Sequence, residues 1–125
     1  MAENPARGRL VETPEIRRLR RRIDVLDRRI VGLLNERTRL ARDTGRAKSE
    51  AGRRAIRDAE REREILLRIT MANEGPMPQA DLIALYRRLF AATRALEAAD
   101  RQRDRRASDG NGPDARDRDR RRRDD

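Results

Sequence analysis

Residues Thr13–Lys48 read TPEIRRLRRRIDVLDRRIVGLLNERTRLARDTGRAK, and this stretch decides the fold. Its apolar residues recur at alternating spacings of three and four at Ile16, Leu19, Ile23, Leu26, Ile30 and Leu33, and the same register continues to Leu40 and Ala47 with the polar Arg37 and Thr44 between them. This register predicts one continuous helix, from about Glu15 to Lys48, with a coiled-coil-like apolar seam. Thr13 followed by Pro14 is typical of a helix start, because threonine caps free amides and proline suits the first turn. At about 1.5 Å per residue the helix would be ~50 Å long, which favours a dimer.

The composition also favours helices that share a core between subunits. The length of 125 residues suggests a single domain, yet 45% of the residues are charged and only 2% are aromatic, namely Tyr86 and Phe90. So little apolar bulk would fill a compact monomer poorly, whereas long helices from two chains can share one core. We therefore expect an all-α protein that forms a homodimer.

Two further helices are predicted after the first. The second begins at residue 57 or 58 and ends near residue 72, and the third covers about 79–99 or somewhat more. The glycine-containing stretch 49–55 predicts a loop, and the sequence NEGPMP at 73–78 predicts a helix stop and restart.

The two ends of the chain differ from this helical part. Residues 1–13 hold proline, glycine and scattered charges without a period, and they predict a flexible arm. Residues 102–125 are mostly arginine and aspartate with two alanines as their only apolar residues, so they predict a disordered charged tail. The helical domain is therefore expected over residues 14–101.

Several classes of site are excluded by residue types that the chain lacks. There is no cysteine and no histidine, which excludes disulfide scaffolds, Cys/His metal sites and nucleophiles that use a histidine base. No metal and no cofactor are expected. No apolar run approaches the ~20 residues that span a bilayer, and residues 1–13 contain no signal-like apolar core. A cytoplasmic protein is the resulting expectation.

Polar residues interrupt the apolar stripe of each predicted helix. They are Arg37 in the first helix, with Arg20 on the flank of its seam, Glu62 in the second, and Thr93 and Glu97 in the third. A buried charge is costly unless paired, so one interpretation is a structural ion pair between Arg37 and Glu62 or Glu97. The other is a shared polar pocket with an excess of cations, to which Arg20, Arg37, Lys48 and Arg61 would contribute. Such a pocket suits a small anion with more than one carboxylate, and its chemistry would rest on positioning and electrostatics.

Four stretches together resemble the all-helical (type II) chorismate mutase family. They are Leu19–Asp27; Asn35–Arg37 with Gly45–Lys48; Ile56–Glu62; and Leu85–Leu89 with Ala95–Glu97. They occur in that family's order over about residues 15–100. The resemblance implies a three-helix subunit with one long first helix, in an intertwined homodimer with two active sites. It also implies the conversion of chorismate to prephenate, an intramolecular Claisen rearrangement of the shikimate pathway that leads to phenylalanine and tyrosine.

The resemblance also implies the catalytic residues, which are Arg37, Lys48 and Glu97. Arg20 from one chain and Arg37 from its partner would bind the two carboxylates of chorismate. Lys48 and Glu97 would lie at the ether oxygen of the breaking bond, where Glu97 can donate a hydrogen bond only when it is protonated.

Four further substrate-binding positions follow from the same resemblance. Asp58 and Glu62 would hold the ring hydroxyl region, and Arg61 would support a carboxylate. Thr93 matches a family position that is often serine.

Other interpretations remain open. The same fold could serve an aminodeoxychorismate mutase or an isochorismate pyruvate-lyase, although the acidic motif Asp58–Glu62 disfavours the lyase. A basic helical nucleic-acid-binding protein is a different class, suggested by the net charge of +10 and by Arg120–Arg123. Aspartates interspersed in the tail and the lack of aromatic residues for base stacking disfavour it. A purely structural dimerisation module is the last alternative.

Overall fold

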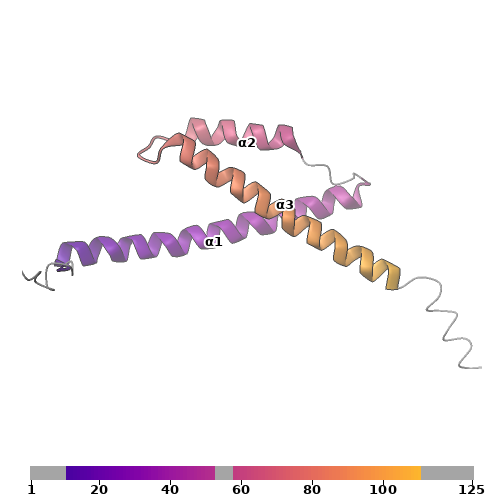
Figure 1. Ribbon diagram of the computed structural model, residues 1–125, viewed down its shortest axis with the longest axis horizontal. Helices are drawn as coiled ribbons and strands as arrows, with labels where there is room; N and C mark the ends of the chain where they lie inside the picture. Colours follow the sequence, from indigo (N-terminus) through magenta and orange to yellow (C-terminus); the bar gives the residue numbers. More distant parts are fainter. Residues whose placement is uncertain (1–10, 53–57, 111–125) are drawn as a thin grey trace, which may run out of the picture. The chain divides into compact units, whose positions relative to one another are not determined.

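A computed structural model describes residues 11–52 and 58–110, which form three helices and no strand. These are α1 (Pro14–Glu50), α2 (Ala59–Ala72) and α3 (Gln79–Gly110) (Figure 1). The predicted all-α class is confirmed. The predicted arm, loop and tail lie outside the described residues over 1–10, 53–57 and 111–125. Within the described part, no helix is long and apolar enough to cross a membrane.

The chain divides into two compact units, Met1–Arg39 and Leu40–Asp125. In the first unit, α1 begins at the predicted cap. The backbone N–H of Ile16 donates to Thr13 Oγ1 at 3.2 Å, and that of Arg17 donates to the Thr13 carbonyl at 3.0 Å. Glu15 adds a negative charge near the positive end of the helix dipole. The cap accounts for the sharp start of α1 after Thr13.

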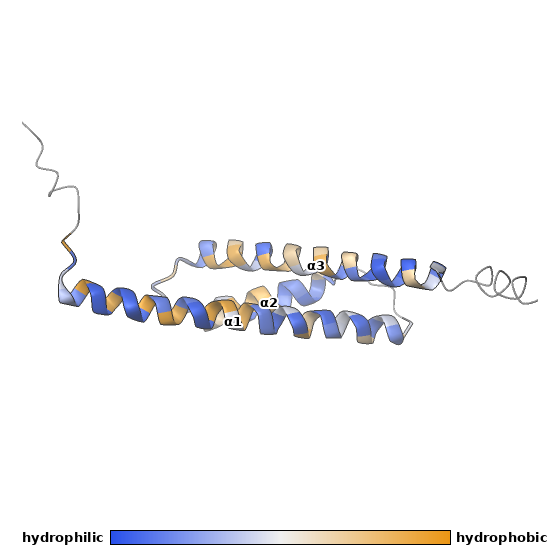
Figure 2. Ribbon diagram, turned by 90° about the horizontal axis from the view of Figure 1, so that it is seen from below, coloured by the Kyte–Doolittle hydropathy of each residue, from blue (hydrophilic) through white to orange (hydrophobic). Residues whose placement is uncertain are grey.

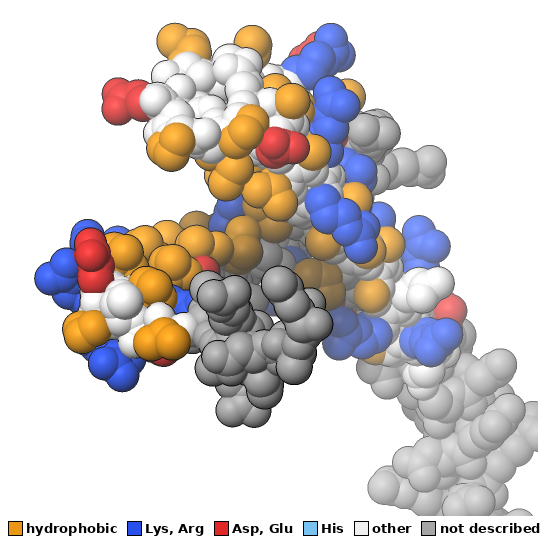
Figure 3. Space-filling model, turned by 60° about the vertical axis from the view of Figure 1, so that its left-hand side comes forward, with side chains coloured by type: hydrophobic (Ala, Val, Ile, Leu, Met, Phe, Trp, Pro, Cys, Tyr) orange, Lys and Arg blue, Asp and Glu red, His pale blue; other side chains and the backbone are white. Residues whose placement is uncertain are grey.

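The apolar seam of α1 is exposed in the single chain. The exposed fractions are 45% for Leu19, 54% for Ile23, 51% for Leu26, 51% for Ile30 and 59% for Leu33. Hydrophobic residues recur along the helix in Figure 2, and apolar side chains reach its surface in Figure 3. No residue of α1 is buried. The single chain thus forms α1, but the apolar seam of this helix stays exposed to solvent.

The second unit contains a helical hairpin with a small apolar centre. α2 lies alongside the first part of α3 (Figure 1), and the apolar stripe of α2, at Ile65, Leu66 and Ile69, is half-buried. Phe90 is 6% exposed, and its ring meets that of Tyr86 edge to face, with centroids 6.2 Å apart. Both aromatic residues of the chain therefore belong to this hairpin.

The turn between α2 and α3 is held by one asparagine. The backbone N–H of Asn73 donates to the Ile69 carbonyl at 2.9 Å, and its side chain donates to the Met77 carbonyl at 3.0 Å. Asn73 Oδ1 accepts the N–H of Gly75 at 3.0 Å. Gly75 has φ +79°, a value that glycine adopts without a Cβ clash. The predicted stop and restart at 73–78 is confirmed.

α3 is longer than expected. The prediction that residues from Gln102 onward would be disordered is wrong for Gln102–Gly110, which continue the helix. Extending an existing helix avoids the cost of nucleation, and arginine has good helix propensity. Arg103 Nη2 also lies 3.0 Å from Asp100 Oδ1, one turn back on the same helix. The extension therefore needs no buried apolar surface.

Candidate active site

Two of the eight predicted site residues, Arg20 and Arg37, lie on the first part of α1. Arg20 is exposed and forms an ion pair with Glu12, whereas Arg37 is half-buried. Because they are separated by 17 residues on one continuous helix, their backbones lie about 25 Å apart along its axis. One small ligand cannot contact both residues of the same chain. Within a single subunit the two arginines therefore do not converge on one pocket.

Lys48, Asp58 and Arg61 meet where α2 begins. Asp58 is the N-cap, and its Oδ1 accepts the backbone N–H of Arg61 at 3.0 Å. Lys48 Nζ, near the end of α1, lies 3.5 Å from Asp58 Oδ2. The pKa of the Asp58 carboxyl lies below its ordinary value, mainly because of the bond from the Arg61 N–H and further because of the charge of Lys48. Asp58 thus caps one helix and contacts the other.

Glu62 is paired with an arginine that the sequence analysis did not single out. Its Oε1 forms an ion pair with Nη1 of Arg94 on α3, and the Glu62 side chain is only 18% exposed. The two residues line a cavity of about 320 Å³ between α2 and α3, which Leu66 and Phe90 also border. Arg94 lies one turn after the buried Phe90, so its position on the α2-facing side follows from helical spacing.

Thr93 and Glu97 lie one turn apart on α3. Thr93 is 7% exposed, and its hydroxyl donates to the Leu89 carbonyl of its own helix at 2.9 Å. The half-buried Glu97 lies against Gly45 of α1, so closely that a Cβ added to Gly45 would lie 3.3 Å from Glu97 Oε1. Gly45 precedes Lys48 by one turn on the same face of α1. Glu97 is thereby brought to the part of α1 that carries Lys48.

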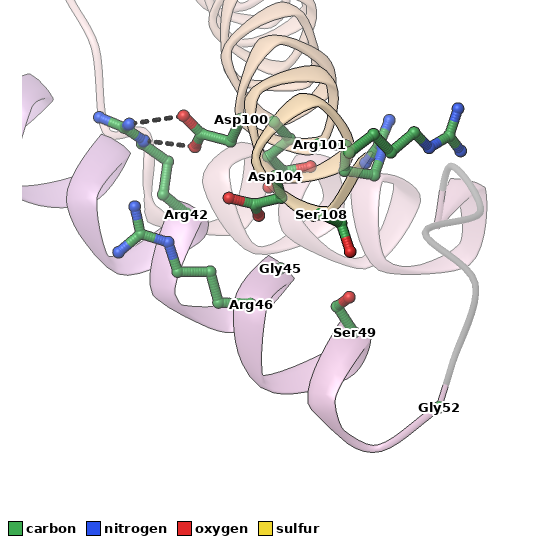
Figure 4. A pocket seen from close by; sticks show the side chains of 11 residues that line it. Arg42, Gly45, Arg46, Ser49, Gly52, Asp100, Arg101, Asp104 and Ser108 are labelled. Carbon is green, nitrogen blue, oxygen red and sulfur yellow. Dashed lines mark hydrogen bonds and ion pairs between the residues drawn. The ribbon is translucent and has the colours of Figure 1, made fainter. Parts of the chain in front are cut away.

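A second contact links α1 and α3 beside Glu97. Arg42 Nε donates to Asp100 Oδ2 at 2.8 Å, and Arg42 Nη2 donates to Asp100 Oδ1 at 2.7 Å (Figure 4). This bidentate bond holds the pKa of Asp100 below its ordinary value and raises that of Arg42. Sequence reasoning missed the pair, because neither residue interrupts an apolar stripe.

An open groove of about 900 Å³ lies between the end of α1 and the second half of α3 (Figure 4). Its lining residues include Arg42, Gly45 and Arg46 of α1 and Glu97, Asp100 and Asp104 of α3. Charges of both signs line it, so its walls can offer hydrogen bonds to a polar ligand. Of the predicted site residues, only Glu97 lines this groove.

The structure thus brings the predicted residues together in groups. Asp58 forms an ion pair with Lys48 and accepts the backbone N–H of Arg61, while Thr93 and Glu97 share one face of α3. Glu62 forms an ion pair with Arg94 of α3.

The similarity to known proteins extends over parts of all three helices. The family profile described as chorismate mutase type II matches residues 19–98. A bifunctional chorismate mutase/prephenate dehydratase from Aquifex aeolicus is 41% identical over 87 residues, which cover 66% of this chain and 24% of that protein. A protein of the same name from Stutzerimonas stutzeri is 34% identical over 90 residues, covering 69% of this chain and 25% of the relative. The chain spans about a quarter of the length of these curated relatives.

Solved structures agree with the sequence matches. Form II of the chorismate mutase from Thermus thermophilus is 37% identical and superposes with a TM-score of 0.63, covering 67% of this chain and 94% of that chain. Form I is also 37% identical, with a TM-score of 0.60 and coverage of 63% and 98%. The resemblance inferred from the sequence is confirmed. Because the matched residues make up well over half of the chain and include parts of all three helices, this protein belongs to the type II chorismate mutase family.

Proposed function

We propose that this chain catalyses the rearrangement of chorismate to prephenate. The observation that carries the proposal is the family match over residues 19–98, within which all eight predicted site positions fall. Those positions hold arginine, lysine, carboxylates and a threonine. This inventory suits a substrate with two carboxylates, an ether oxygen and a ring hydroxyl.

The chemistry needs no nucleophile from the protein. In this Claisen rearrangement, the C–O bond of the ether breaks as a C–C bond forms within the same molecule. The protein must hold the side chain of chorismate over its ring, which is an orientation effect. It must also stabilise negative charge that develops on the ether oxygen.

In the proposed site, Lys48 and Glu97 act at the ether oxygen. The ammonium of Lys48 carries three donors, so its 3.5 Å contact with Asp58 leaves others for the substrate. Glu97 donates in its protonated form. Arg37 binds one carboxylate of the substrate and Arg61 supports a carboxylate, while the remaining contacts come from Asp58, Glu62 and Thr93.

The proposal includes a homodimer in which Arg20 completes the partner's site. Two observations support it. The ~25 Å along α1 between Arg20 and Arg37 is too far for one small substrate within a single chain. The seam of α1 is also exposed along its length, and an apolar stripe of this kind is normally covered by another helix.

The test is turnover of purified protein, followed as loss of chorismate and appearance of prephenate. Arg37→Ala should lower kcat/KM about 10- to 100-fold, because a hydrogen bond to a charged group contributes roughly 1.5–3 kcal/mol. Arg39→Ala, which removes an exposed arginine two residues away, is the matched control and should retain activity.

Aminodeoxychorismate and isochorismate, assayed in parallel, separate the related reactions on this fold. Inactive wild-type protein on chorismate would refute the proposed function. Full activity in Arg37→Ala would refute the site while leaving the function in place.

A further inference from the structure

We infer that Arg42, Asp100 and Gly45 are positioning residues for Glu97, an assignment that rests on the proposed function of Glu97 at the ether oxygen. None of the three belongs to the predicted substrate contacts. Asp100 also lies beyond the residues 19–98 that the family profile matches. Their role follows from how α1 and α3 meet in the second unit.

Two contacts one helical turn apart fix α3 on α1. On α1, Arg42 precedes Gly45 by three residues, and on α3, Asp100 follows Glu97 by three residues. Residues at this spacing share one face of a helix. The Arg42–Asp100 pair and the Gly45–Glu97 contact therefore act on the same two faces, and together they restrict both sliding and rotation of α3 against α1.

The Arg42–Asp100 pair has the geometry of a specific contact. It is bidentate, at 2.7 and 2.8 Å, and the side chains are 29% and 13% exposed. A bidentate guanidinium–carboxylate pair fixes direction as well as distance, which a single point charge does not. The carboxylate of Asp100 thereby holds the turn of α3 that carries Glu97.

Gly45 supplies the space that Glu97 occupies. A Cβ at Gly45 would lie 3.3 Å from Oε1 of Glu97, which is closer than most van der Waals contacts, and 3.4 Å from its Cδ. A side chain at position 45 would therefore shift the Glu97 carboxyl group by a few tenths of an ångström or more. Since Lys48 follows one turn later, the absence of a side chain at Gly45 keeps Glu97 beside the helix face that carries the other proposed donor.

The test uses the full chain and a double-mutant cycle with chorismate as substrate. Asp100→Asn keeps the side-chain shape but removes the charge, and it should lower kcat about tenfold with little change in KM, because a misplaced group loses transition-state contacts. In a Glu97→Ala background the same substitution should have almost no further effect, since Asp100 acts only through Glu97. Arg42→Lys, which keeps the charge but not the bidentate bond, should show a smaller loss and serves as a second probe if Asp100→Asn folds poorly.

Arg103→Ala is the matched control, because Arg103 contacts the same Asp100 Oδ1 at 3.0 Å from within α3. It should leave kcat unchanged. Active wild-type protein with equal losses from Asp100→Asn in both backgrounds, or with no loss in either, would overturn the inference while leaving the proposed function standing. Wild-type protein that does not turn over chorismate would overturn both.

Discussion

At the scale of single residues, Asp58 shows how one carboxylate serves structure and a predicted site at once. It caps α2 through the N–H of Arg61 and contacts Lys48 of α1. Its pKa is lowered in the folded protein, so folding favours the ionised form. The stabilisation that Asp58 provides is therefore present above its unfolded pKa of about 3.9 and is lost as the pH falls through its folded value.

The pH dependence of this stabilisation leads to a prediction for Asp58→Asn. Asparagine still caps a helix but carries no charge, so the variant should melt at a lower temperature than the wild type at neutral pH. The gap should begin to close as the pH falls below about 4 and should vanish below the lowered pKa of the folded protein, where the wild-type carboxyl is also neutral. Melting followed by circular dichroism between neutral and acid pH measures this, and a gap that stays constant would contradict it.

At Gly45, one substitution should raise the stability of the protein and lower its activity. Alanine is favoured over glycine inside a helix by roughly 0.5–1 kcal/mol, and the group that it would crowd is the end of the flexible Glu97 side chain. Gly45→Ala should therefore raise the melting temperature by a few degrees while lowering kcat several-fold, because Glu97 moves.

Gly32 provides the control for this substitution. It lies on the same helix, but a Cβ added there would meet nothing within 4 Å. Gly32→Ala should bring the gain in stability without the loss of activity. Equal kcat in the two alanine variants would show that Glu97 does not depend on the space at Gly45.

At the scale of elements, α3 combines an anchored half with an exposed extension. Its first half carries the buried Phe90 and Thr93, whereas Gln102–Gly110 are exposed throughout. Backbone hydrogen bonds that are not covered by packed side chains open at low free energy. We expect the amides of 102–110 to exchange with deuterium much faster than those near Phe90, as measured by mass spectrometry on the native protein. Equal protection along α3 would contradict this and would require the extension to be covered.

The three helices show which parts of the fold can be predicted from the sequence alone. Local chemistry determines the start of α1 after Thr13, the turn at Asn73 and the apolar periodicity of all three helices. The sequence therefore predicted these helices, and their starts to within a residue or two. The end of α3 was mispredicted, because composition reports whether a segment can build a core and not whether it can prolong a helix that already exists. The pairs Arg42–Asp100 and Glu62–Arg94 were also missed. Each joins residues from different helices whose charges look like ordinary exposed ones along the chain.

At the scale of the whole molecule, the single chain is an incomplete unit for the proposed reaction. The helix that should hold both carboxylate-binding arginines spaces them about 25 Å apart, and its apolar seam has no cover within its own unit. The proposed homodimer would resolve both problems together, because the second copy would cover the seam and bring its Arg20 toward the other residues. Assembly and catalysis would then depend on the same face of α1.

This coupling predicts the effect of a charge placed in the seam. Leu26 is 51% exposed in the single chain and lies in the middle of the seam. Leu26→Glu should convert the proposed homodimer to a monomer, as measured by sedimentation equilibrium. In a symmetric dimer each substitution acts twice, so a cost of about 1.4 kcal/mol per copy weakens association about a hundredfold. Activity should fall in parallel and recover partly at high protein concentration.

Arg28→Glu places the same charge on the opposite side of α1, and it should leave both assembly and turnover intact. A Leu26→Glu monomer with full activity would show that one chain completes the site alone, and the role of Arg20 in the partner's site would be wrong.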